Sequence, residues 1–315
     1  MKYGFRQDPY ASRHTFRGGY ATTARSGLLS YDGEFRRSNS GVFTSVFARA
    51  SGIEILRFYG FGNETPSAGP DRFFKVKQQQ VELAPSINVP LGPRVTSYVG
   101  PRVKYSNTDL PADRFISVAR PYGVEGFGET GLGGGLRIDS RDHASAATRG
   151  LLFDVSGNFY PAWWDVAKAF GEVHGQMATY LTASSAPLKP TLALRVGGKH
   201  VWGDYPFHEA AFLGGSSTVR GFRNDRFAGD ASLYGNVELR LYLTRFFFLL
   251  PGEMGVFGLG DAGRVYFAGE ASDRWHTAAG GGLWFSFLNR DATLTIAAAR
   301  SDERTGLYVR AGFIF

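Results

Sequence analysis

The segment Asn236-Val237-Glu238-Leu239-Arg240-Leu241-Tyr242-Leu243-Thr244 alternates strictly between polar and aliphatic side chains. Successive side chains of a β-strand point to opposite faces, so this period of two predicts a strand with one apolar and one polar face. The polar face carries Glu238 and Arg240, which need either water or a partner of opposite charge. The two faces of this strand are therefore expected to meet very different surroundings.

The same alternation recurs along the chain. Clear examples are segments 27–37, 81–89, 94–106, 192–197 and 305–315. In the last segment, one face is expected to carry Leu307, Val309, Ala311, Phe313 and Phe315. Several runs exceed the roughly 5–6 residues that are common for strands of soluble sheets. They match the strands of membrane barrels, which have about ten residues, apolar side chains toward lipid and polar side chains toward the lumen.

The connections between the expected strands fall into two length classes. The short ones are 24–27, 90–93, 186–190 and 289–291. The long ones are 60–72, 107–125 and 202–230. Tight turns at one rim and long loops at the other are typical of outer-membrane barrels, in which the long loops are extracellular.

The predicted fold is all-β, a 16-stranded antiparallel transmembrane β-barrel, with an even strand number as bacterial barrels have. Residues 1–315 are expected to form this single domain, without a further soluble domain, with both ends on the periplasmic rim. The expected strands lie near 2–9, 14–24, 27–37, 41–49, 53–60, 73–89, 94–106, 128–140, 149–160, 169–184, 190–201, 231–245, 253–267, 275–288, 292–301 and 305–315.

Composition excludes several other classes of protein. The 315 residues include 27 Phe, 15 Tyr and 42 Gly, and this aromatic content argues against disorder. The chain has no apolar run of about 20 residues, as a membrane-spanning helix requires, and its first residues lack the apolar region of a signal peptide. The absence of cysteine excludes disulfides and thiolate chemistry. The net charge of +7 comes from scattered basic residues, so we expect no nucleic-acid partner.

Motifs of known catalytic chemistry are missing from the sequence. Two G-x-G-x-x-G matches, at 126–131 and 258–263, lie in expected strands and open no helix that could bind a pyrophosphate. The histidines show neither i, i+2 nor i, i+4 pairing; they are His14, His143, His174, His200, His208 and His276. We therefore expect no metal site, no cofactor and no enzymatic activity.

The segment Leu213–Phe227 within the longest loop mixes glycines and aromatic residues with Arg220, Arg223 and Arg226. Seen alone, it is compatible with a solvated external loop. Glu238 and Asp261, however, lie on the polar faces of two neighbouring expected strands, and carboxylates that point into a lumen need a cation. Arg220 could supply one through a bidentate guanidinium. We therefore expect Arg220 inside the barrel, hydrogen-bonded to one or both acids.

Val219-Arg220-Gly221-Phe222 resembles the V-R-G-[FY] motif in the sixth extracellular loop of the BamA/TamA outer-membrane assembly superfamily, the bacterial surface antigen barrels. The resemblance implies that this loop folds into a 16-stranded barrel and that its arginine contacts acids on strands 12 and 13. Glu238 and Asp261 occupy the corresponding positions. Segment 135–142 is similar to the family's G-L-x-x-D-[ST]-R-D strand end, and segment 58–64 to a G-x-G-N-[ED] loop.

The end of the chain, Phe313-x-Phe315, is similar to the family's C-terminal assembly signal, although Arg310 stands where a glycine is usual. The periplasmic POTRA domains of many family members are missing from the sequence.

The resemblance implies a protein of the bacterial outer membrane that inserts or secretes polypeptides, through a weak seam between the expected strand at 2–9 and the strand at 305–315. Its partners would be outer-membrane lipid, lipopolysaccharide and unfolded polypeptide clients, and the chain would be a monomer or a weak dimer. Two alternatives remain open: a membrane anchor or export pore for an N-terminal enzyme domain absent from this chain, and a soluble β-rich binding protein.

Overall fold

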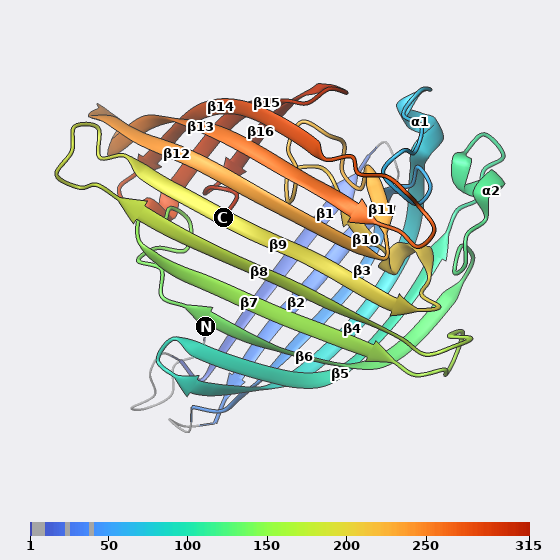
Figure 1. The fold of residues 1–315 in the computed structure, drawn as a ribbon. Coiled ribbons are helices and arrows are strands. Elements are labelled where there is room, and N and C mark those ends of the chain that lie inside the picture. The colour runs from blue at the N-terminus through green and yellow to red at the C-terminus, as the bar shows by residue number, and fades with distance from the viewer. Residues whose placement is uncertain (2–9, 23–25, 38–40) are drawn as a thin grey trace.

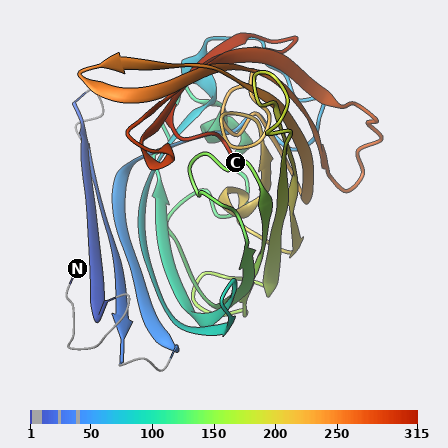
Figure 2. The same ribbon diagram turned by 90° about the vertical axis from the view of Figure 1, so that its left-hand side faces the viewer.

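The computed structural model describes residues 1, 10–22, 26–37 and 41–315. Within these residues, fourteen strands form one antiparallel sheet that curls around an interior, and sequence neighbours pair throughout, except that β9 pairs with β12 (Figures 1 and 2). The strands are β1 (Ser12–Ala21), β2 (Ser26–Arg36), β3 (Phe43–Arg57), β4 (Lys75–Gly92), β5 (Val95–Thr108), β6 (Phe127–Asp139), β7 (Gly150–Tyr160), β8 (Phe170–Thr182), β9 (Thr191–Gly203), β12 (Ala231–Phe248), β13 (Leu250–Tyr266), β14 (His276–Phe287), β15 (Thr293–Arg300) and β16 (Thr305–Ala311).

The remaining elements are short and lie in the connections. They are α1 (Asp71–Phe74), α2 (Phe115–Ala119), the 3-10 helices η1 (Phe207–Glu209) and η2 (Arg290–Ala292), and the paired strands β10 (Ala211–Leu213) and β11 (Phe227–Gly229). None of the described helices is long and apolar enough to cross a membrane.

The two faces of the sheet have the inverse of the burial found in a soluble protein. On β12, the aliphatic Val237 and Leu239 are 41% and 47% exposed, whereas Glu238 and Arg240 between them are 1% and 4% exposed. A sheet with apolar side chains outside and charged side chains inside fits a lipid exterior and a polar lumen. The all-β, antiparallel, barrel-like fold class that the alternation predicts is therefore confirmed.

The expected order of the first strands needs one correction. The two strands expected at 41–49 and 53–60 form one continuous strand, β3, whose register against β4 shifts between Ser51 and Glu54. This irregularity and Gly52 interrupt the alternation, and the interruption resembles a turn in the sequence. The strand expected at 2–9 lies outside the described residues. The described sheet consequently has fourteen strands.

Long loops gather at one rim of the sheet, here called the long-loop rim, at 58–74, 109–126 and 204–230. The opposite, short-turn rim includes the turns at 93–94 and 288–292, as the sequence predicts. Because β3 is one strand, the connection between β1 and β2 lies on the long-loop rim rather than on the short-turn rim where it was expected.

The last residues of the chain leave the sheet after Ala311, so the expectation that Phe313 and Phe315 continue one face of the last strand is wrong. Gly312 adopts a φ of +77°, in the left-handed region that favours glycine, and the Phe313 amide donates to Ser145 O at 2.9 Å. Phe315 is 8% exposed and packs against a cluster that includes Tyr180 and Leu152. The alternation ends with Ala311 because a backbone turn, which side-chain periodicity does not reveal, sends the chain into the interior.

The sheet has two free edges within the part of the chain that the structure describes. There, β1 pairs with β2 alone and β16 with β15 alone. Figure 2 shows the deep-blue β1 standing at the left margin of the sheet.

Candidate functional site

Residues 204–230 fold back into the interior of the sheet. The β10–β11 hairpin of this segment contacts β9, β12 and β13 (Figure 1). An apolar cluster holds the segment in the interior against the wall, which here means the strands of the sheet. The loop contributes Leu213, Val219, Phe222 and Phe227, and the wall contributes Tyr234, Val265 and Ala278. This burial presents the loop backbone to the polar side chains of β12 and β13.

Arg220 joins the loop to two acids on adjacent strands. Its Nε and Nη2 donate to the two carboxylate oxygens of Asp261, both at 2.7 Å, and its Nη1 donates to Glu238 Oε1 at 2.5 Å. The Arg220 backbone N–H also donates to Asp261 Oδ2, at 2.9 Å. The structure thus brings together the three residues that the sequence singled out, in the bidentate geometry that a guanidinium favours.

The charges of this group are almost completely removed from solvent. The side chains of Arg220, Glu238 and Asp261 are 5%, 1% and 0% exposed. Burial alone would lower the pKa of Arg220, but hydrogen bonds and Coulombic attraction from Asp261 and Glu238 raise it above its ordinary value. Arg220 therefore remains charged, and removal of it would leave Asp261 without its buried cation and Glu238 with Arg240 alone.

The other residues of the Val219–Phe222 motif have distinct packing roles. Gly221 has a φ of +88°, and a Cβ there would lie 2.9 Å from Ser301 N, so a side chain would be both strained and obstructed. Its N–H donates to the Tyr308 hydroxyl at 2.7 Å. Phe222 packs edge-on against Phe227. The glycine thus lets the loop approach β16 while the aromatic ring fills the interior.

Sequence reasoning missed three partners of this group. Asn236 Nδ2 donates to Asp261 at 2.7 Å, and Arg195 Nε donates to Asn236 Oδ1 at 2.9 Å. Arg240 donates to Glu238 Oε2 through Nη2 at 2.7 Å. Asn236 and Arg240 stand two residues from Glu238 on the same strand face, and this parity is a signal that could have identified them.

Arg240 also connects the group to the end of the chain. Its guanidinium lies 3.7 Å from the ring centroid of Phe313, and its Nη2 donates to Phe315 O at 3.0 Å. The residues expected to form the C-terminal assembly signal therefore lie beside the buried charges in this folded state.

The other two arginines of the loop have different surroundings. Arg226 is 3% exposed; it donates to Glu303 at 2.9 Å and to Thr65 Oγ1 at 2.7 Å. Arg223 pairs with Asp71 at 2.7 Å, and its side chain is 36% exposed. Only Arg220 of the three is held between two fully buried acids.

Segments 58–64 and 135–142, which also resemble family motifs, make hydrogen bonds near the two rims. Asn63 Nδ2 donates to Val265 O at 2.8 Å and to Glu270 at 2.9 Å on the long-loop rim. Asp142, on the short-turn rim, accepts hydrogen bonds from Thr148 and Arg290. Segment 58–64 therefore joins a long loop to the end of β13, and segment 135–142 orders the short-turn rim.

A model of the Omp85 superfamily domain matches residues 16–282, which is most of the chain. The chain belongs to the Omp85 superfamily. Members of this superfamily are β-barrels of the bacterial outer membrane, so the location expected from the sequence is confirmed, and the exposed aliphatic face of this Omp85 barrel is its lipid face.

Two solved structures share the fold of this Omp85 chain. A form of BamA from Haemophilus ducreyi lacking POTRA domains 1–3 has 14% sequence identity and a TM-score of 0.59, with 96% of this chain and 70% of that chain covered. CdiB from Acinetobacter baumannii has 15% identity and a TM-score of 0.56, with 95% of this chain and 53% of that chain covered. At these identities the likeness concerns the fold alone. No curated protein matches the chain in sequence.

Proposed function

We propose that this Omp85 barrel inserts polypeptides into the outer membrane or secretes them across it, without catalysing a chemical reaction. Membership of the superfamily supports a role in handling polypeptides, and the fold is shared with BamA and CdiB. Its partners are then the lipid and lipopolysaccharide of the membrane and an unfolded polypeptide client, with the barrel acting as a monomer or weak dimer.

The observation that carries the proposal is the pair of free sheet edges. Within the described residues, β1 and β16 each pair on one side only, so the backbone N–H and C=O groups on their other sides are not paired with another described strand. A free edge can accept an extended segment as an added strand, and the backbone bonds make this recognition largely independent of sequence. The client strand would pair here before it leaves into the membrane or across it.

In this proposal Val219, Arg220, Gly221 and Phe222, together with Glu238 and Asp261, lock the loop in the lumen while an edge is engaged. These residues act structurally and not as catalysts. Phe313 and Phe315 serve as the C-terminal assembly signal of this chain itself. Because both lie inside the folded barrel, they are accessible to an assembly factor before this barrel folds.

Site-specific crosslinking tests the edges. Since the chain has no cysteine, a photo-crosslinker attached to a single engineered cysteine is unique. Phe16→Cys on β1 and Leu307→Cys on β16 place it at the two edges, and Val173→Cys places it on β8 within the sheet; all three native side chains are exposed on the outer surface. In liposomes, a urea-unfolded outer-membrane barrel protein should crosslink to the two edge sites while it folds.

Labelling of the Val173→Cys control as strong as that of the edge sites would contradict recognition at the edges. Absence of any crosslink, with no acceleration of client folding, would favour the alternative role of an anchor or export pore for an N-terminal enzyme domain.

A further inference from the structure

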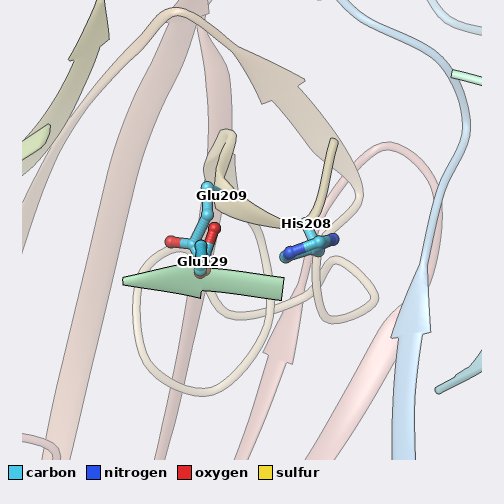
Figure 3. A group of neighbouring side chains, drawn as sticks. All are labelled: Glu129, His208 and Glu209. Carbon is cyan, nitrogen blue, oxygen red and sulfur yellow. The ribbon is translucent and has the colours of Figure 1, made fainter. Parts of the chain in front are cut away.

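A second group of buried ionisable side chains lies in the interior, apart from Arg220. Glu129 projects from β6, and His208 and Glu209 belong to η1 at the start of the inward-folded loop (Figure 3). One potential ligand atom from each residue lies within 4.8 Å of the others. All three residues are buried, with exposures of 0%, 8% and 7%.

Glu129 lacks the partners that a buried carboxylate requires. Neither of its carboxylate oxygens has a hydrogen bond. The ammonium of Lys104 lies 3.7 Å from Glu129 Oε1, which is beyond hydrogen-bonding distance. An ionised carboxylate removed from water needs hydrogen bonds or a close cation, and Glu129 instead lies beside the carboxylate of Glu209, so the two acids need either a shared proton or a cation between them.

The surroundings are already arranged for positive charge. Lys104 forms an ion pair with Glu209 Oε1, and Lys199 lies 3.6 Å from Glu209 Oε2. Lys104 therefore marks a position near both carboxylates at which a cation is stabilised. The Lys104 ammonium is close enough to pair with Glu209 but too far from Glu129 for a hydrogen bond.

His208 provides a nitrogen donor beside the two acids. Gln78 Nε2 lies 3.4 Å from its Nδ1, and Ser106 Oγ lies 3.3 Å from its Nε2. Both contacts are long, so they orient the ring without strongly occupying either nitrogen. Polar groups that orient a histidine in this way are typical of the surroundings of metal ligands.

We propose that Glu129, His208 and Glu209 bind a divalent transition-metal ion, with zinc as the representative ion. Two carboxylates and one imidazole are suitable donors for zinc and similar ions, whereas calcium and magnesium favour oxygen donors alone. The ion occupies the position near the two carboxylates at which the Lys104 ammonium now lies, and the Lys104 side chain moves away from it.

The bound ion would tie the start of the 204–230 loop to β6. Arg220 ties the later part of the same loop to β12 and β13, so the loop gains anchors on two parts of the wall. The sequence spacing of the histidines predicted no metal site because Glu129 and His208 are distant in the chain and meet only through the inward fold of the loop. The proposal is independent of which client the barrel handles.

Metal binding to the full chain tests this site. The chain is prepared in detergent without a histidine tag, stripped with a chelator and titrated with Zn²⁺ by calorimetry. We expect one ion per chain, and at least tenfold weaker binding for Glu129→Gln and for His208→Gln. His200→Gln, which alters an exposed histidine on β9, is the matched control and should bind like the unmodified chain. Co²⁺ should give visible absorption bands that both site variants lose.

Heat-modifiable gel mobility verifies that each variant is folded before titration. Zn²⁺ should also slow proteolysis of the 204–230 loop in the unmodified chain and in His200→Gln but not in the site variants. Equal binding by all chains would show that Zn²⁺ sits elsewhere and would overturn the proposal. Absence of stoichiometric binding would overturn it too, and would indicate that Glu129 is held neutral by a proton.

Discussion

The β12–β13 wall and the β1–β2 wall follow the same sequence pattern but hold their charges differently. On β12 and β13, Glu238 and Asp261 are 1% and 0% exposed and bind Arg220 of the loop. On β1 and β2, Arg17 pairs with Asp32 across the strands, with side chains 63% and 44% exposed. The first wall is covered by the inward-folded loop, whereas the second lies at an edge of the sheet that the described residues form.

The difference shows that alternation decides which face a charge occupies but not what the charge contributes. Exposed ion pairs are screened by water and typically contribute about 0–1 kcal/mol. When one member of a buried pair is lost, the remaining charge has neither a partner nor water around it, and the free energy of unfolding falls by roughly 3–5 kcal/mol. The inward-folded loop, rather than the strands, makes the lumenal ion pairs of β12 and β13 buried instead of exposed.

The largest effect is expected for Arg220→Ala. It leaves Glu238 and Asp261 without their shared cation and should destabilise the folded barrel by up to roughly 3–5 kcal/mol, less where water enters the lumen. The 204–230 loop should become sensitive to protease, and pore conductance in planar bilayers should rise. Arg223→Ala, which alters a partly exposed pair with Asp71, is the matched control. Equal effects of the two substitutions would show that the buried group does not hold the loop.

A charge introduced on the lipid face should destabilise the folded barrel by a similar amount on both walls. Leu239→Arg on β12 and Phe16→Arg on β1 each place a cation on the lipid face, where such a change costs about 2–4 kcal/mol near the bilayer centre. Both native side chains are exposed on the outer face. Folding into liposomes, followed by gel mobility across a urea series, measures the loss. Leu239→Ala is the control and should cost less. A tolerated Phe16→Arg would mean that β1 does not face lipid.

An intermediate effect is expected for Arg226→Ala. Arg226 is buried and donates to Glu303 and Thr65, but Glu303 is 19% exposed and can regain water when the arginine is lost. Loss of hydrogen bonds to a charged group of this kind costs about 1–3 kcal/mol. The urea midpoint of folding should fall less than for Arg220→Ala. A decrease in the urea midpoint as large as that of Arg220→Ala would contradict the expectation that deeper burial makes the loss of an ion pair more destabilising.

The smallest effect is expected for Arg17→Ala on the exposed wall. Because Arg17 and Asp32 both remain in contact with water, the loss should stay below about 1 kcal/mol and should shrink further at high salt. Thermal midpoints of gel mobility at low and high salt provide the measurement. A loss comparable to that of Arg226→Ala would indicate that something covers this wall in the membrane.

Local patterns were sufficient to predict part of the candidate site. The Val219–Phe222 motif identified the loop arginine by resemblance, and strand parity placed Glu238 and Asp261 on the polar face; their contacts with Arg220 are present. Asn236 and Arg240 were missed although parity also places them there. Parity assigns a residue to a face, but it does not indicate which of the residues on that face meet.

The fold class, the lipid and lumenal faces of most strands and most of the division into short turns and long loops can be predicted from the amino-acid sequence. Each follows from a period of two or from turn residues, which are properties of neighbours in the chain. Three other features are visible only in the folded chain: β3 is a single strand, Phe313 and Phe315 turn inward at Gly312, and Glu129 lies beside His208 and Glu209. These features depend on a register shift, on one backbone dihedral angle and on contacts between distant segments, and side-chain alternation records none of them.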